Sequence, residues 1–423
     1  MLKMISVSEA KQSILNNIEP LTPVTIALQE AAGLVLAEDV FAFIDIPAFN
    51  QSSMDGYAFR YQDFAQAKTL EITGEVAAGV NTTFEDLTGK AVRIFTGAPV
   101  PEGADTVVMQ EKVKTNNKSL LIEDGQIIKG SNVRPAGAEI KSGGLALKKG
   151  TFLSPAAIGF LAGIGVSKVK VFPKPTVTII VTGKELQQPG MQLQPGQVYD
   201  SNSFMIKAAL LQLHIFTVEI RFADDNIEIV QKALENALQT SDVVLLTGGV
   251  SVGDYDFVVQ ATELCGVEKL FHKVKQRPGK PLYFGKKESK IVFGLPGNPS
   301  SVLTCFYEYV IPAVGQLTMQ RNIIKTGQKL LGKDYSKKTS LTHFLKGKKE
   351  DNIVFPLDAQ ESFRLSSFAN ADCLICLPED KEEFKKDDLV EVHLLPLKQV
   401  FTWLKVLLFF IFYYFLLHFY MRQ

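Results

Sequence analysis

Three short apolar runs in the second half of the chain constrain its fold more than any other feature. They are rich in β-branched residues and occupy residues 176–181 (TVTIIV), 242–246 (DVVLL) and 290–293 (KIVF). Continuous apolar runs of this length are typical of strands that are buried on both faces of a parallel sheet. Helical stretches lie between and after them, at residues 201–213, 227–239 and 300–314. The alternation predicts a doubly wound α/β domain.

The sequence before and after this domain has a different residue pattern. A short amphipathic helix is predicted near the N-terminus, where Ser6 and Glu9 have capping-box spacing. From about residue 41 onward, short β-rich runs separated by Gly, Pro and Asn turns predict an irregular β domain. Examples of these runs are residues 91–95, 106–109 and 119–122. Another helix is predicted at residues 154–163. A β-like residue pattern after Thr326 predicts a small C-terminal β module.

The overall charge and the cysteine content exclude some classes of protein. Lys and Arg number 45, as do Asp and Glu, so no net charge would attract the chain to nucleic acid. Four cysteines in 423 residues argue against a disulfide framework, and the chain opens with no secretory signal. We therefore expect a cytoplasmic protein in which any anion site is local.

An apolar and aromatic run near the C-terminus breaks this pattern. Residues 400–420 are interrupted only by Lys405 and His418, and their length is close to that of a spanning helix. One interpretation is a C-terminal membrane anchor. The other is an accretion or artefact outside the folded unit. Residues 398–423 are therefore assigned no function.

Each of the three predicted strands ends in a turn that is rich in small or polar residues. These turns occupy residues 182–185, 247–256 and 294–301. Ligands of open α/β sheets bind beyond the carboxyl ends of the strands, where glycines let backbone N–H groups approach a phosphate. A glycine in a single turn usually serves only the backbone conformation of that turn. Three such turns at equivalent strand ends, however, predict an anion or nucleotide site.

Charged residues cluster near these turns. Cations gather in the segment 271–281 (FHKVKQRPGKP), which is either a solvated face or a shaped oxyanion site. Acids occur at the ends of strands and loops, at Glu185, Asp224, Asp225, Asp254 and Asp256. Most such acids only cap helices. Beside a phosphate they would repel the ligand unless a divalent ion lay between them, which points to Mg²⁺.

Eight motifs, in order along the chain, resemble those of the molybdopterin molybdenumtransferase family, known as MoeA in bacteria and as the E domain of gephyrin in animals. They are SMDGYA at residues 53–58, TGAP at 96–99, NVR at 132–134, TGKEL at 182–186, DSN at 200–202, TGGVSVGDYD at 247–256, PGKP at 278–281 and LPGNP at 295–299. The resemblance extends from the first helix to about Pro396.

The resemblance implies a multi-domain fold of α/β and β domains. Its parts would be a helical linking domain (1–40 and 141–173), an irregular β domain (41–140), a doubly wound MogA-like α/β domain (174–326) and a C-terminal β-barrel-like module (327–397). It also implies a transferase that, with Mg²⁺, converts adenylylated molybdopterin and molybdate to AMP and molybdenum-molybdopterin. Members are homodimers whose cleft is shared between subunits, and a separate molybdopterin adenylyltransferase would supply the substrate.

Site roles are carried over from the family motif by motif. The catalytic residues implied are Asp55, Glu185, Asp256, Lys273, Arg277 and Lys280. The substrate-binding residues implied are Thr96, Arg134, Gly248, Gly249, Ser251, Gly253, Pro296, Gly297, Asn298, Pro299 and Ser300. The metal ligands implied are Asp55, Glu185, Asp224 and Asp256.

The chain departs from the family pattern at three places. Arg277 stands where a Lys is usual, which keeps the charge but alters its geometry. Glu139 stands where Asp is common, and the apolar tail has no family counterpart.

Other patterns give weaker hypotheses. Cys373 and Cys376 have the spacing of a zinc or redox pair, but on a strand they would face opposite sides, so they are interpreted as core cysteines without a neighbouring His. Two rival functions remain: a nonenzymatic scaffold that binds partner peptides, and a hydrolase of a nucleotide-linked compound.

Overall fold

The computed structural model describes residues 4–80, 82–248 and 257–396, which form two compact units. Unit 1 combines the described residues up to Val24 with those from Phe172 onward, and unit 2 comprises residues 25–171. Within these described ranges, no helix has the length and apolar character needed to cross a bilayer. The apolar run at residues 400–420 lies outside them.

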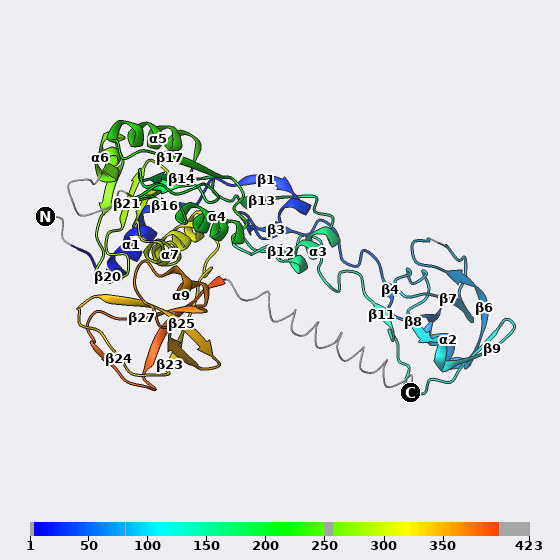
Figure 1. Cartoon of the computed structure of the whole chain (residues 1–423). Coiled ribbons are helices and arrows are strands. Elements are labelled where there is room, and N and C mark those ends of the chain that lie inside the picture. Colours follow the sequence, from blue (N-terminus) through cyan, green and yellow to red (C-terminus); the bar gives the residue numbers. More distant parts are fainter. Residues whose placement is uncertain (1–3, 81, 249–256, 397–423) are drawn as a thin grey trace, which may run out of the picture. The chain divides into compact units, whose positions relative to one another are not determined.

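The α/β domain of unit 1 is built on a six-stranded sheet (Figure 1). Its strands lie in the order β17 (Val218–Ala223), β14 (Val177–Thr182), β18 (Val243–Thr247), β22 (Lys290–Leu295), β21 (Tyr283–Lys287) and β19 (Glu268–Phe271). The three strands predicted from apolar runs are confirmed as β14, β18 and β22, and they are parallel. The sheet is nevertheless mixed, because β21 is antiparallel to both of its neighbours. Only Glu288 and Ser289 separate β21 from β22, which is too short for a parallel crossover.

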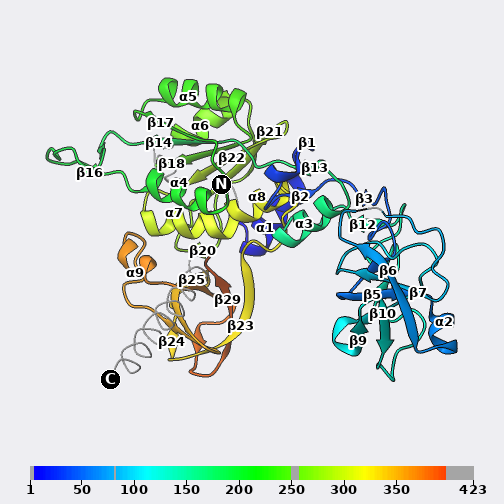
Figure 2. The same ribbon diagram turned by 90° about the vertical axis from the view of Figure 1, so that its right-hand side faces the viewer.

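Helices cover both faces of this sheet, as a doubly wound fold requires (Figures 1 and 2). Helices α5 (Ile227–Thr240) and α6 (Phe257–Leu264) pack on one face, where Ile180, Val244 and Leu246 point. The opposite face, which receives Ile179 and Leu245, is covered by α1 (Val7–Asn17), α4 (Asn202–Gln212) and a long helical segment. Successive residues of each strand therefore pack into two separate hydrophobic cores, one on each face of the sheet.

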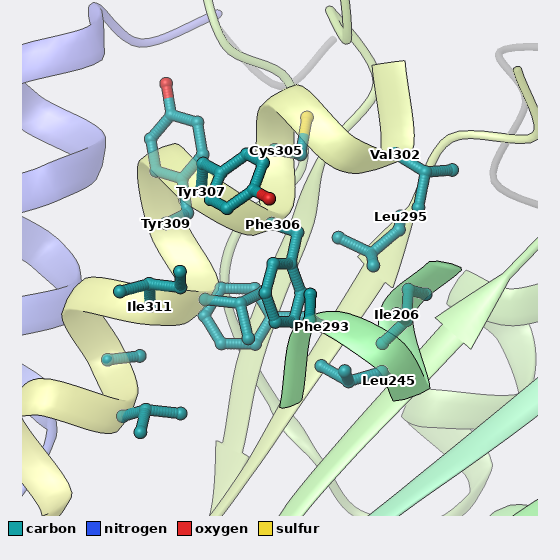
Figure 3. Close-up of a cluster of buried hydrophobic side chains, with 14 of the residues drawn as sticks. Ile206, Leu245, Phe293, Leu295, Val302, Cys305, Phe306, Tyr307, Tyr309 and Ile311 are labelled. Atoms are coloured by element: carbon teal, nitrogen blue, oxygen red, sulfur yellow. The ribbon is translucent and has the colours of Figure 1, made fainter. Parts of the chain in front are cut away.

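The long helical segment runs through α7 (Pro299–Cys305), a π-helical turn η3 (Phe306–Val310) and α8 (Ile311–Leu317). All residues from Ser300 to Ile311 are buried. Figure 3 shows its side chains meeting those of β18, β22 and α4 in one cluster. Pro312 lacks an N–H and its ring would crowd the carbonyl of Glu308, which explains why the helix widens at this point.

A buried ionic junction holds three parts of unit 1 together at Glu308. Its carboxylate accepts from Lys11 Nζ of α1 at 2.7 Å and from His393 Nδ1 of β29 (Leu389–Leu394) at 2.6 Å. Burial alone would raise the pKa of Glu308, but the two cationic partners outweigh it and hold that pKa below its usual value. Burial would likewise lower the pKa of His393, but the hydrogen bond and charge of Glu308 raise it.

The C-terminal β module is a closed five-stranded barrel, as the barrel-like prediction required. Its strands are β23 (Lys325–Leu331), β25 (Thr342–Glu350), β26 (Ile353–Pro356), β27 (Cys373–Leu377) and β29. Pairing of β25 with β27 closes the ring. A short strand of the α/β domain, β20 (Gln276–Arg277), adds in parallel to β25. The cationic segment of the sequence is thereby fixed to the barrel.

Unit 2 is rich in β-structure, as predicted for its central part. Its largest sheet has the order β8 (Thr106–Met109), β5 (Gly56–Phe59), β7 (Lys90–Ile94), β6 (Thr69–Val76), β10 (Ser119–Ile122) and β9 (Val113–Asn116). A smaller sheet of β1 (Val24–Ala27), β13 (Lys168–Phe172) and β2 (Val35–Leu36) accompanies helix α3 (Pro155–Gly163). The predicted β-rich runs are confirmed as β7, β8 and β10.

We predict that His393→Gln destabilises the protein most at low pH. The pKa of His393 is higher in the folded protein than in the unfolded chain. The charged imidazole therefore stabilises the fold fully at pH values below the pKa of the unfolded chain, and this stabilisation is lost as pH rises through the pKa of the folded protein. Glutamine keeps a neutral hydrogen-bond donor but cannot carry the charge. The variant should therefore lose unfolding free energy on the order of 3 kcal/mol at a pH of about 6, and this loss should shrink toward a pH of about 8.5. The lowered pKa of Glu308 keeps that carboxylate ionised throughout this window. Urea unfolding of both proteins measures the difference. A loss that stays constant or grows with pH contradicts the junction.

Candidate active site

A cavity of about 880 Å³ lies in unit 1 where the α/β domain meets the barrel. Four groups of residues form its walls: the turns after β14 and β22, residues 198–202 at the entry to α4, the cationic turn after β20, and a loop of the barrel. Its charged lining residues are Glu185, Asp200, Arg277, Lys280 and Glu361. The cavity therefore carries fixed charges of both signs on rigid turns, as the strand-end argument predicted.

Glu185 lies in the turn that follows β14. The turn reverses at Gly183, whose φ of +142° disfavours other residues, and a Cβ there would lie 2.9 Å from the carboxylate oxygens of Glu185. The backbone N–H of Lys184 donates to the carboxylate of Asp225 at 3.2 Å. Asp225 thus steadies this turn, whereas the predicted ligand Asp224 is exposed and does not line the cavity.

The turn after β22 forms the floor of the cavity with Pro296, Gly297, Asn298 and Pro299. Asn202 holds it in place, because its Nδ2 donates to Gly297 O and to Thr247 Oγ1, each at 2.9 Å. The ends of β18 and β22 are therefore tied together by one side-chain amide. Gly248 belongs to the same arrangement, because a Cβ there would lie 2.3 Å from Thr182 O.

The cationic turn carries Arg277 and Lys280 on a buried anchor. Gln276 is fully buried, donates from Nε2 to Gly279 O at 2.9 Å and accepts from the Tyr309 hydroxyl. Gly279 has a φ of +81°, and a Cβ there would lie 2.5 Å from Cys305 Sγ. Figure 3 shows Cys305 and Tyr309 on the buried helical segment. Both cations are exposed to the cavity, so this segment is a shaped site and not merely a solvated face.

A second group of predicted residues lies in unit 2. The Asp55 carboxylate accepts from the backbone N–H of Thr96 at 2.8 Å and from its hydroxyl at 2.7 Å. These two bonds hold the pKa of Asp55 below its usual value, so the side chain is ionised at neutral pH. Arg134 lies in the same unit on β11 (Val133–Arg134), which pairs with β4 (Gln51–Ser52), the strand that precedes Asp55 in the chain.

Close packing, not a turn, explains the glycine after Asp55. Gly56 begins β5, and a Cβ on it would lie 1.8 Å from the carbonyl oxygen of Val108 on β8. The glycine is therefore required by a contact between neighbouring strands. Any side chain at residue 56 would push these strands apart.

The structure brings seven predicted residues to one cavity and leaves others elsewhere. Those that line it are Glu185, Arg277, Lys280, Pro296, Gly297, Asn298 and Pro299. Ser300 is buried directly behind, and Lys273 is half-buried away from the lining. Gly249, Ser251, Gly253 and Asp256 lie outside the described residues. The barrel residues Leu341 and Gln360 to Phe363 also line the cavity and were missed, because no local pattern in their sequence marks a contact with a distant turn.

One group of potential metal ligands occurs in the described part of the chain, away from the cavity. The ligand atoms of Cys376, Glu391 and His393 lie within 4.8 Å of one another, so the expectation of no histidine beside the cysteines was wrong. Pairing of β27 with β29, which no local pattern shows, brings them together. Both nitrogens of His393 already face carboxylates, Glu308 and Glu391, which favours an imidazolium over a metal ligand. Cys373 is buried in the barrel core, as predicted.

Comparison with known families and proteins extends these observations. The MoeA N-terminal region (domain I and II) matches residues 5–165, a probable molybdopterin binding domain matches residues 178–316, and the MoeA C-terminal region (domain IV) matches residues 330–395. With the fold above, these matches define a multidomain protein built around an α/β domain of the molybdopterin-binding class. The chain belongs to the MoeA family of molybdopterin molybdenumtransferases.

Individual relatives agree over nearly the whole length. The molybdopterin molybdenumtransferase of Haemophilus influenzae is 34% identical over 398 residues, which are 92% of this chain and 98% of that protein. That of Staphylococcus epidermidis is 36% identical over 403 residues, or 92% and 95% of the two chains. A crystal structure of the MoeA protein from Pyrococcus horikoshii is 31% identical, has a TM-score of 0.79, and covers 93% of this chain and 99% of its own.

We predict that Gly56→Ala destabilises unit 2 and disturbs the Asp55 loop. The added methyl group collides with backbone, which cannot rotate away, so the expected loss is at least 1–3 kcal/mol, roughly the cost of overpacking. Gly159→Ala in helix α3 is the matched control, because nothing lies within 4 Å of its Cβ position. It should be neutral or stabilise by about 0.4–1 kcal/mol. Chemical unfolding of both variants tests this, and equal effects would contradict the contact.

Proposed function

We propose that this chain catalyses the insertion of molybdate into adenylylated molybdopterin, releasing AMP and forming molybdenum-molybdopterin. The observation that carries the proposal is the cavity in which Arg277 and Lys280 face the strand-end turns of the α/β domain. Family membership supplies the identity of the substrates. Fixed cations of this kind suit both the molybdate dianion and the phosphates of a nucleotide-linked substrate.

The residues of the cavity would divide the work between binding and orientation. Arg277 and Lys280 would hold the oxyanions, and the backbone of the Pro296 to Pro299 turn would support the substrate at the start of α7. Gln276 anchors the backbone turn that carries the two cations. No side-chain nucleophile is required, because a positioned phosphoanhydride can be cleaved by water with AMP as the leaving group.

The carboxylates are suited to Mg²⁺, which we propose as the cofactor. Glu185 is exposed in the cavity and Asp55 is held ionised by Thr96, so both offer the oxygen ligands that Mg²⁺ prefers. The family motifs add Asp224, which does not line the cavity, and Asp256, which lies outside the described residues. When bound, the ion would neutralise the phosphate oxygens beside these acids.

We also propose that the protein acts as a homodimer in the cytoplasm, with a molybdopterin adenylyltransferase as the companion enzyme. The family resemblance implies the dimer, and a shared cleft would bring the predicted site residues of unit 1 together with those of unit 2. Unit 2 also exposes several large apolar side chains, which in a monomer would contact water. They include Phe41 (47% exposed), Phe43 (77%), Ile44 (47%) and Phe49 (44%).

Lys280→Met should abolish most of the transferase activity, by a factor of about 10²–10³, because a fixed cation in a sheltered site contributes strongly to stabilisation of developing charge. Purified protein would be given adenylylated molybdopterin, molybdate and Mg²⁺, and AMP and active cofactor would be measured. Lys232→Met on α5, on the opposite face of the sheet, is the control and should retain activity. Release of AMP that does not depend on molybdate would favour a hydrolase, and no turnover at all would favour a scaffold.

The homodimer proposal predicts complementation between inactive variants. If each cleft combines Asp55 of one subunit with Lys280 of the other, a mixed dimer of Asp55→Ala and Lys280→Met subunits has one intact cleft and one doubly altered cleft. Random mixing should then restore about a quarter of the wild-type activity. Subunits would be unfolded and refolded together, with each variant alone as the control. If a verified mixed dimer recovers no activity, the shared cleft is contradicted, because Asp55 and Lys280 would then act within one subunit or not in a common site.

A further inference from the structure

The loop of the barrel that lines the cavity rests on one buried cation. Lys346, in the middle of β25, is only 2% exposed. Its ammonium group donates to three backbone carbonyls of this loop: Ala359 O at 2.8 Å, Arg364 O at 3.0 Å and Glu361 O at 3.5 Å. An ammonium group has three donors, so these carbonyls use its full capacity. A lysine buried to this extent normally requires such partners.

A second set of bonds fixes the same loop to the backbone of β25. The side-chain amide of Gln360 accepts from Lys346 N at 3.0 Å and donates to Lys346 O at 2.9 Å and Leu357 O at 2.8 Å. Lys346 therefore holds the loop through its main chain and its side chain together. The loop is held to one strand of a closed barrel and has little freedom to shift.

The loop is also joined to the floor of the cavity. Ser362 O accepts from the backbone N–H of Ser300 at 3.0 Å, and Ser362 Oγ lies 3.0 Å from Asn298 Nδ2, which donates to it. The N–H of Ser300 lies in the first turn of α7, where backbone donors have no partner within the helix. Its partner is supplied by the barrel. Gln360, Glu361, Ser362 and Phe363 then form the wall beside this floor.

We propose that Lys346 is a positioning residue for the reaction: it does not itself line the cavity but holds the loop 359–364 so that Ser362 closes the cavity floor at Asn298 and Ser300. Removing its ammonium group leaves three carbonyls without their donor, and the loop can then leave α7. The cavity would widen on the barrel side. The kinetic consequence rests on the proposed function, whereas the structural consequence does not.

The experiment compares Lys346→Met, which keeps the length of the side chain but has no donors, with Lys346→Arg, which keeps the charge and the donors. Leu345→Ala is the matched control, because Leu345 is the neighbouring residue of β25, 3% exposed, and packs into the barrel core on the other side. It should lower stability by about 2–5 kcal/mol without touching the loop.

Two measurements separate positioning from simple destabilisation. Hydrogen exchange at the Ser300 amide, in protein without substrate, should be at least about tenfold faster in Lys346→Met than in wild type or Leu345→Ala. The KM for adenylylated molybdopterin should rise about tenfold with a smaller change in kcat, because the substrate is held less well by a wall that moves. Lys346→Arg should restore both values most of the way. Should Lys346→Met fail to fold, Lys346→Gln, which keeps two donors on a shorter stem, takes its place.

The inference is overturned if Ser300 exchanges no faster in Lys346→Met than in Leu345→Ala, or if exchange quickens while KM stays at the wild-type value. An inactive wild-type protein would instead refute the proposed function. In that case the exchange measurement, which needs no substrate, still decides whether Lys346 holds the loop.

Discussion

The carboxylate of Glu308 lies at the centre of unit 1, and it can remain ionised there only because Lys11 and His393 meet it. The three partners come from the N-terminal helix, the buried helical segment and the last barrel strand, so their pairing fixes three distant parts of the chain against one another. The apolar cluster shown in Figure 3 buries side chains of the sheet, α4 and the helical segment together, and the ion pairs join this segment to α1 and β29. Because the barrel is held in this way, its loop can form one wall of the cavity and its edge can receive β20.

The cavity follows from this arrangement together with a few backbone contacts that admit only glycine. Gly248 and Gly279 approach neighbouring atoms so closely that no side chain fits, and Asn202 and Gln276 tie the adjacent turns to buried elements. The anchoring group is buried and the charged groups are exposed: Gln276 lies inside while Arg277 and Lys280 face the cavity. Anchored turns of this kind would suit the proposed oxyanion chemistry, because donors that need not move when charge develops cost no reorganisation. Asp55 is prepared in the same manner in unit 2, by two bonds from Thr96.

Much of the fold could be predicted because it depends on local patterns. The apolar runs that became β14, β18 and β22, the capping box at Ser6 and Glu9, and the strand-end turns all carry their signal within a few residues. The motifs also predicted which side chains would meet at the cavity, among them Glu185, Lys280 and Asn298. Prediction failed where the cause was distant in sequence. The antiparallel strand β21, the proximity of His393 to Cys376 and the loop around Ser362 depend on strand pairing and domain contact, which leave no periodic trace.

The sequence by itself determined the kinds of elements, their order, and the residue types available for anion binding, because backbone propensity, burial pattern and charge are properties of short segments. Only the tertiary structure decided that β20 joins the barrel, that Gly56 is required by the carbonyl of Val108, and that Lys346 holds the wall of the cavity. These features arise from hydrogen bonds and steric contacts between residues far apart along the chain. Their partners are chosen by packing of the whole molecule, and no segment contains that information alone.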